Sequence, residues 1–285
     1  MLTSRWKNLT GSRDSRAFLA AFGLLLCCVS GTAASAEVIS VESLQFSRVQ
    51  LLGSNELEVT QGEANALKIR GDSDDLEPPP FVVEGDMLRL GIRADGESVR
   101  DLQFKLTVTD IRELQLKGSG EAFVKPLAVD DLQVEVEGSG EMHMFDVKAG
   151  DLDIRVLGSG AVEAVNVQAR SARLHVKGSG DIDLGTLEAD IIKAHMAGSG
   201  DVIVQGSGRA NVLEVGVMGS GDVRLKGVEA KTAKVTIMGS GDVEIRVQES
   251  LEAEILGSGD LVYFGNPTTS KSVMGSGDIT QRDGR

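Results

Sequence analysis

The stretch MGSGDVRLKGVEAKTAKVTIMGSGDV (residues 218–243) contains the same hexapeptide twice, twenty residues apart. Its core, Gly-Ser-Gly followed by a small or acidic residue, recurs until the chain ends. The tripeptide begins at Gly118, Gly138, Gly158, Gly178, Gly198, Gly219, Gly239, Gly257 and Gly275. The intervals run from 18 to 21 residues. A repeat of this length is typical of proteins in which each unit buries its apolar face against its neighbours.

Apolar and polar residues alternate within each repeat, as in DLQVEVEGSGEMHMFDV (residues 131–147). This period of two indicates strands, because successive side chains of a strand point to opposite faces. The apolar residues recur at every second position, and both glycines of the tripeptide fall in the same series of positions. Two interpretations follow: a straight strand with both glycines pointing inward, or a bend, where glycine adopts dihedral angles that other residues avoid.

A single coil of about twenty residues buries too few aliphatic side chains to offset its own ordering cost of roughly 30 kcal/mol. Stacked coils, ~4.8 Å apart, would share a continuous core and pair their backbones. We therefore predict an all-β fold, with residues 102–285 forming a single-stranded parallel β-helix of about nine coils of 18–21 residues. An extra copy, GSGR at 206–209, falls in the one interval of 21 residues and predicts an altered turn.

Residues 37–101 lack the Gly-Ser-Gly period and contain alternating strands separated by Gly, Asn and Asp turns. We expect this strand-rich N-terminal part to open the solenoid and to cover its first exposed edge.

Residues 1–36 have the features of a secretory signal peptide. Four basic residues precede the apolar run AFLAAFGLLLCCVSG (residues 17–31), and ASA at 34–36 predicts cleavage between Ala36 and Glu37. Leu26 before Cys27 disfavours a lipid anchor. Removing this segment takes away both cysteines and changes the net charge from −14 to −17. A strongly acidic chain is a poor partner for nucleic acid or anionic membranes, and no membrane-spanning apolar run follows residue 36.

Several segments together carry a resemblance to a known family. They are FSRVQLLGSNELEVTQG (46–62), MLRLGI (87–92), LQLKGSG (114–120) and the serial GSGD coils. In this order they resemble the bacterial family "Putative auto-transporter adhesin, head GIN domain", over roughly Phe46 to Ile279. The resemblance implies a β-helical fold in an exported protein and brings no catalytic residues with it.

The residue after each tripeptide is acidic in eight of nine repeats, with Ala161 as the exception. Carboxylates stacked at ~4.8 Å repel by about 1 kcal/mol in water, so something must offset the repulsion. The structural interpretation is that each Asp accepts hydrogen bonds from turn amides and from the serine two residues earlier, with the serines forming a hydroxyl ladder. The functional one is weak Ca²⁺ binding, with Ca²⁺ as the possible cofactor. Its candidate ligands are Asp181, Asp201, Asp222, Asp242, Asp260 and Asp278.

Other site chemistries find little support. A phosphate loop needs a terminal Lys-Ser/Thr and a following helix, which GSGDV lacks. His175 and His195 occupy the same place in adjacent coils and would make a metal pair, but no third ligand is visible in the sequence. His143 falls elsewhere on the coil, without a partner for hydrolytic chemistry.

The position immediately before the tripeptide changes from polar to apolar along the chain. Late coils carry Met218, Met238, Leu256 and Met274 there. If exposed, these side chains predict a partner surface or a homo-oligomer contact; alternatively, a bend before the glycine tucks them into a corner.

The sequence therefore predicts an exported, non-catalytic β-helical protein of a bacterium, located in the periplasm or at the cell surface. Its role would be adhesin-like, or that of an envelope binding or structural module, with an unknown protein or glycan of the cell envelope as partner. Two alternatives stay open: a polysaccharide-active enzyme, by analogy with other β-helices, and a calcium-stabilised envelope scaffold.

Overall fold

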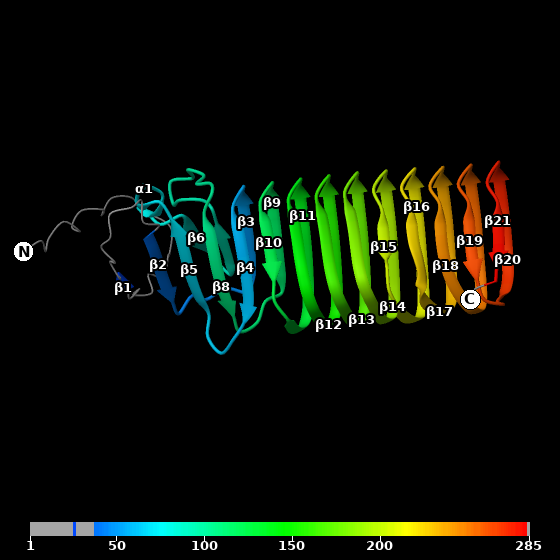
Figure 1. Ribbon diagram of the computed structural model, residues 1–285, viewed down its shortest axis with the longest axis horizontal. Helices are drawn as coiled ribbons and strands as arrows, with labels where there is room; N and C mark the ends of the chain where they lie inside the picture. The colour runs from blue at the N-terminus through cyan, green and yellow to red at the C-terminus, as the bar shows by residue number, and fades with distance from the viewer. Residues whose placement is uncertain (1–24, 27–36, 284–285) are drawn as a thin grey trace, which may run out of the picture.

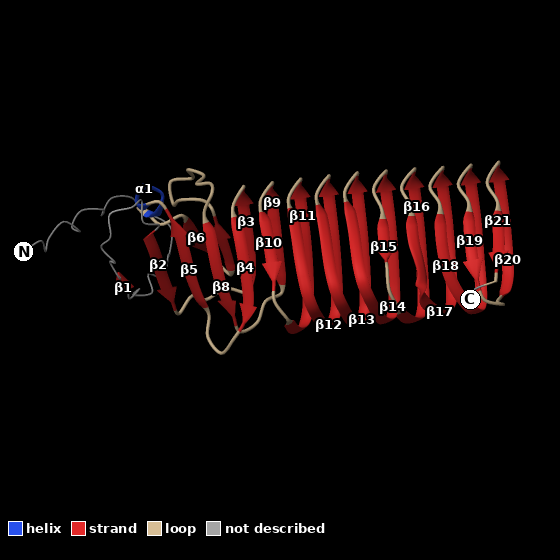
Figure 2. Ribbon diagram, in the orientation of Figure 1, coloured by secondary structure: helices blue, strands red, loops and turns tan. Residues whose placement is uncertain are grey.

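The strands of the protein stack side by side into one long solenoid (Figure 1). The computed structural model describes residues 25–26 and 37–283. About 72% of the described residues are in strands, and they form one small helix and about eight solenoid turns, close to the nine coils predicted. The all-β solenoid prediction is thus confirmed (Figure 2). The predicted signal peptide lies outside the described residues, apart from the short β1 (Leu25–Leu26). Its predicted cleavage, between Ala36 and Glu37, would fall directly before β2 (Glu37–Glu42).

Each coil is flattened into two strand segments that run in opposite directions (Figure 1). We call them the pre-turn segment, which leads into the tripeptide, and the post-turn segment, which follows it. The strands of the repeat region are β9 (Glu113–Gly118), β10 (Glu121–Val124), β11 (Leu127–Gly138), β12 (Glu141–Gly158), β13 (Ala161–Gly178), β14 (Asp181–Gly198), β15 (Val202–Val204), β16 (Gly208–Gly219), β17 (Val223–Gly239), β18 (Val243–Gly257), β19 (Leu261–Phe264), β20 (Thr268–Gly275) and β21 (Ile279–Arg282).

Neighbouring coils pair in parallel, and differences in repeat length are absorbed at the turn opposite the tripeptide. In the 21-residue interval Leu184 pairs with Val204, but Leu187 pairs with Gly208. The extra residue therefore sits in the segment that joins β15 to β16, where GSGR predicted an altered turn. The tripeptide end keeps its register through every coil.

The core runs along the solenoid axis, between the two strand segments of each coil. The same inward position stays apolar from coil to coil, with at most 6% exposure. One such column contains Leu132, Leu152, Ala172, Ile192, Leu213, Ala233 and Leu251. Each buried aliphatic side chain contributes about 1.5–3 kcal/mol, so the stack supplies what one coil lacks.

The tripeptide forms the turn between the two strand segments, so the bend interpretation is correct. The first glycine of all nine copies has a φ between +118° and +146°, which L side chains rarely adopt. The backbone N–H of each central serine donates to a glycine carbonyl of the preceding coil at 2.8–3.0 Å. The second glycine faces the preceding turn so closely that a Cβ there would collide with its backbone.

The N-terminal part contributes coils of its own. Its elements are β2 (Glu37–Glu42), β3 (Arg48–Gly53), β4 (Glu56–Gln61), β5 (Ala66–Gly71), α1 (Ser73–Leu76), β6 (Phe81–Glu84), β7 (Met87–Leu90) and β8 (Gln103–Val108). β3 and β4 pair in parallel with β9 and β10, and Gly53 lies beside Gly118. Gly53, Ser54 and Asn55 therefore form a further turn of the tripeptide kind.

A long excursion of the chain, residues 62–112, folds back over the open side of that coil. β7 and β8 pair in parallel with the other edge of β3 and β4. β6 pairs antiparallel with β7, and β5 pairs antiparallel with both β8 and β2. These antiparallel strands cover the first edge of the parallel stack. No helix in the described part of the chain is long and apolar enough to cross a membrane.

Candidate functional site

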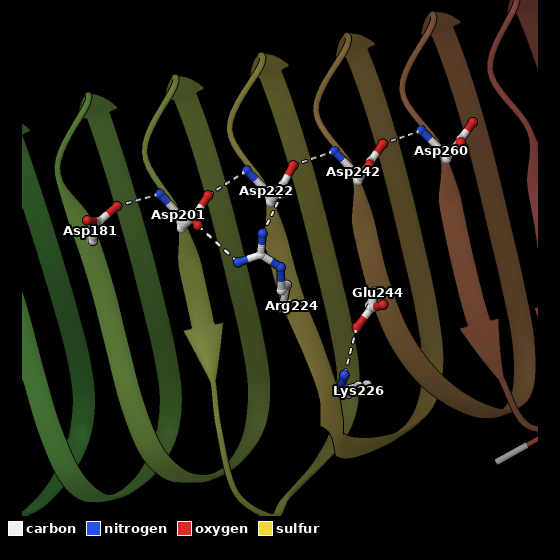
Figure 3. A network of polar contacts seen from close by, with 8 residues as sticks. All are labelled: Asp181, Asp201, Asp222, Arg224, Lys226, Asp242, Glu244 and Asp260. Carbon is white, nitrogen blue, oxygen red and sulfur yellow. Dashed lines mark hydrogen bonds and ion pairs between the residues drawn. The ribbon is translucent and has the colours of Figure 1, made fainter.

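The aspartates that follow the tripeptide form a hydrogen-bonded ladder along the solenoid (Figure 3). From the second member on, the backbone N–H of each Asp donates to Oδ1 of the Asp in the preceding coil, at 2.8–3.1 Å. The members are Asp181, Asp201, Asp222, Asp242, Asp260 and Asp278, and Oδ1 of the last one accepts from the N–H of Ile279. The turn amides are thus the donors that the structural interpretation expected.

The ladder begins where the sequence changes to aspartate. The N–H of Asp181 still donates to the carbonyl of Gly160, because Ala161 in the coil before it has no carboxylate. The N–H of Glu141 likewise donates to the carbonyl of Gly120 although Glu121 precedes it. The turn N–H therefore donates to the carboxylate of the preceding coil where that residue is the shorter aspartate, and to a backbone carbonyl where it is glutamate. Within the described residues the nine serine hydroxyls make no hydrogen bond: they are exposed at the tips of the turns, so the expected hydroxyl ladder is wrong.

Basic side chains offset part of the repulsion between the stacked carboxylates. Arg224 lies 3.0 Å from Oδ2 of Asp201 and 2.6 Å from Oδ2 of Asp222, and so bridges two coils (Figure 3). Lys226 pairs with Glu244 at 3.2 Å in the same region. Arg224 was not singled out from the sequence, although the 20-residue register places it beside this column. Oδ1 of all six aspartates already has a protein donor; calcium binding stays a prediction.

Asp242→Ala is expected to lower the free energy of unfolding by about 1 kcal/mol, because the N–H of Asp260 loses its acceptor. Asp242→Asn keeps a side-chain oxygen at the same place and should retain most of the stability. Urea denaturation followed by circular dichroism measures both. Equal losses for the two variants would show that the charge, not the hydrogen bond, matters.

An open groove of about 610 Å³ lies on the outward face of the pre-turn segments of β12 to β17. Leu157, Ala197, Met218 and Met238 line it on the side of the tripeptide turns, and its surface is mostly apolar. Ion pairs lie along it: Arg155 with Asp153, Lys193 with Glu214, and Lys234 with Glu252. An apolar centre with a polar rim is the usual composition of a protein interface.

His175 and His195 form the middle of this groove. Their rings stack, with centroids 5.3 Å apart and an interplanar angle of 18°. Burial lowers the pKa of His175 below its usual value, so this imidazole is neutral at pH 7. Next in the column comes Gly216, and the His195 ring lies over the space that a side chain would fill there. Within the described residues no group of three metal-binding side chains includes these two histidines.

The chemistry of the groove is poor in acids. Glu214 is the one carboxylate among the described residues that line it. Lys193 donates to it at 2.6 Å and thereby lowers the pKa of Glu214. Glycoside hydrolysis generally uses two carboxyl groups on either side of the scissile bond, and this groove does not present such a pair.

The apolar residues before the tripeptide point outward and are exposed, and are not tucked into a corner. Their exposed fractions are 56% for Met218, 41% for Met238, 37% for Leu256 and 66% for Met274. These four residues, which we call the apolar column, pair with one another from coil to coil. The first two also line the groove, so the column extends the groove towards the C-terminal end.

The sequence pattern of the family "Putative auto-transporter adhesin, head GIN domain" matches residues 45–206 and, in a second match, 165–267. The chain belongs to this family. Membership of the head GIN domain family indicates an adhesin-type protein of the cell envelope or surface. The resemblance seen in the sequence is thereby confirmed.

Solved structures share the fold of this head GIN domain protein. One is described as a "Putative lipid binding protein" from Parabacteroides distasonis ATCC 8503, with 24% identity and a TM-score of 0.63 over 87% of this chain and 96% of that one. Another is a "putative adhesin" from Parabacteroides merdae ATCC 43184, with 19% identity, a TM-score of 0.67 and the same coverage. No curated protein matches the chain.

Proposed function

We propose that this protein is a non-catalytic, adhesin-like binding module of the bacterial cell envelope. Its contact face is the groove together with the apolar column. The observation that carries the proposal is the exposure of Met218, Met238, Leu256 and Met274 in one column of a protein whose net charge is −14. Aligned exposed apolar side chains mark interaction sites, and methionine adapts its shape to a partner.

The composition of the face favours a protein of the envelope as partner, with a glycan as the second candidate. The groove contains two stacked imidazole rings and aliphatic surface, while Arg155, Glu214 and Lys234 at its rim are paired within the chain. A partner protein with an apolar centre would bury the imidazole rings and the aliphatic surface. The lack of a carboxylate pair in the groove and the family's adhesin description support a role without catalysis.

The double variant Met218→Glu/Met238→Glu is expected to lose at least tenfold in binding to solubilised envelope proteins of the source bacterium. Two buried charges in the centre of an interface would each remain unpaired. Surface plasmon resonance with the immobilised chain measures the binding, and light scattering measures whether copies of the chain associate. Both residues are exposed, so the melting temperature should stay unchanged.

Val165→Glu is the matched control, since Val165 is 53% exposed on the post-turn side and lies away from the groove. It should bind as the unmodified chain does. Equal binding by the double variant and the control would refute the assignment of this face. Loss of self-association alone would instead identify a second copy as the occupant.

A further inference from the structure

A histidine faces three glutamates on the post-turn segments of the early coils, whereas the groove lies on the pre-turn segments. His143 on β12 lies in register between Phe123 on β10 and Glu163 on β13. Its Nε2 is 3.3 Å from a carboxylate oxygen of Glu121 and 3.6 Å from one of Glu141. Its Nδ1 is 3.1 Å from Oε2 of Glu163.

Glu121 and Glu141 are available for this cluster because the ladder does not use them. Both belong to the acidic column, yet the turn amides beside them donate to backbone carbonyls. Their side chains point to His143 and do not accept from the amide of the next turn. Within the described part of the chain, none of the three glutamates forms an ion pair with a lysine or arginine. Three carboxylates thus share a single imidazole, and the cluster has an excess of negative charge.

The imidazole ring is held in one orientation. The Phe123 ring stacks on it with centroids 5.2 Å apart and an interplanar angle of 17°. When Nδ1–H donates to Glu163, the lone pair of Nε2 points at the oxygens of Glu121 and Glu141. A carboxylate that accepts from the far nitrogen of a histidine is the usual arrangement behind a zinc ligand, where it fixes the tautomer.

We propose that His143 Nε2, Glu121 and Glu141 bind a divalent transition-metal ion, with Zn²⁺ as the best fit, and that Glu163 orients the histidine. The ligand oxygens and nitrogen all lie within 4.8 Å of one another. Two ligand atoms that are each 2.0–2.1 Å from a tetrahedral ion are about 3.3 Å apart, which matches the spacing of Nε2 from the two carboxylates. One imidazole and two carboxylates suit zinc and leave a fourth position for water.

Isothermal titration calorimetry of the full chain with ZnCl₂ at pH 7.5 tests the site. We expect one zinc ion to bind per chain. His143→Gln and the double variant Glu121→Gln/Glu141→Gln should lose at least a hundredfold in affinity. Glu163→Gln leaves the three ligands in place and should weaken binding ten- to a hundredfold. Circular dichroism of the zinc-free variants confirms that each one is folded.

Two matched variants keep the test specific. Asp242→Asn removes a charge from the same acidic column, and His195→Gln removes one of the two other histidines; both should bind zinc as the unmodified chain does. The proposal is overturned if the unmodified chain takes up no zinc. It is equally overturned if His143→Gln binds as tightly as the unmodified chain, or if His195→Gln is the variant that loses binding.

Discussion

Replacing Gly200 with valine is expected to lower the free energy of unfolding by about 3 kcal/mol or more. Gly200 is the second glycine of a turn in the middle of the solenoid, and a Cβ there would collide with the carbonyl group of Gly180 in the preceding coil. The strand pairs on both sides of the turn set the distance between coils, so the backbone has no room to yield. Each coil contacts only its neighbours, and a coil pushed away from one of them loses a whole interface.

Ser199→Ala is the control for this substitution. Ser199 lies between the two glycines, is exposed, and its hydroxyl makes no hydrogen bond in the described structure. Its loss should change stability by no more than about 0.5 kcal/mol. Urea denaturation of the two variants measures the difference. If Gly200→Val were as stable as Ser199→Ala, the close approach of adjacent turns would not be the reason for the second glycine.

The repeat region could be predicted from the sequence because its determinants are local and are repeated. Alternation of apolar and polar residues gave the strands, and the constant interval gave the stacking register. The choice between a straight strand and a bend at Gly138 was open, because parity continues through the glycines in both cases. The structure decides it through a φ of +118° at that residue.

The N-terminal part could not be predicted to the same depth, because its stacking order differs from its order in the chain. β7 and β8 lie outside β3 and β4, although they come later in the sequence. No local sequence pattern indicates that the chain folds back to pair β7 and β8 with β3 and β4. The turn at residues 53–55 was also missed, since its third residue is asparagine where the repeats have glycine.

Sequence reasoning located the residues of the candidate sites without their partners. The apolar column was predicted as exposed or tucked away, and only the structure shows its exposure. The groove beside it depends on Gly216, which has no side chain. In the sequence, the column that contains His175, His195 and Gly216 resembles an ordinary solvated face. His143 was set aside for want of a partner, although the 20-residue register already puts Phe123 and Glu163 next to it.

Asn55 explains how the excursion is attached to the solenoid, and its removal is the second large effect that we expect. The side chain is 1% exposed and makes three hydrogen bonds to backbone groups. Nδ2 donates to the carbonyls of Leu52 and Val99 at 2.7 and 2.8 Å, and Oδ1 accepts from the N–H of Leu102 at 2.9 Å. In the repeats, a tight glycine turn of the preceding coil leaves no room for a side chain at the third position of the turn. Beside Asn55 the wide loop that joins β7 to β8 takes the place of that turn, and it leaves room for the asparagine side chain.

Asn55→Ala is expected to cost about 3 kcal/mol, since three buried backbone groups lose their partner. The loss should be largest in the excursion, so limited proteolysis should cleave residues 62–112 before the Gly-Ser-Gly coils. Asn55→Gly restores the residue of the repeats but none of the hydrogen bonds, and φ at Asn55 is not positive. We therefore expect it to be no more stable than Asn55→Ala. A glycine variant with the stability and protease resistance of the unmodified chain would show that the shape of the turn, and not these three hydrogen bonds, holds the excursion over the first coil.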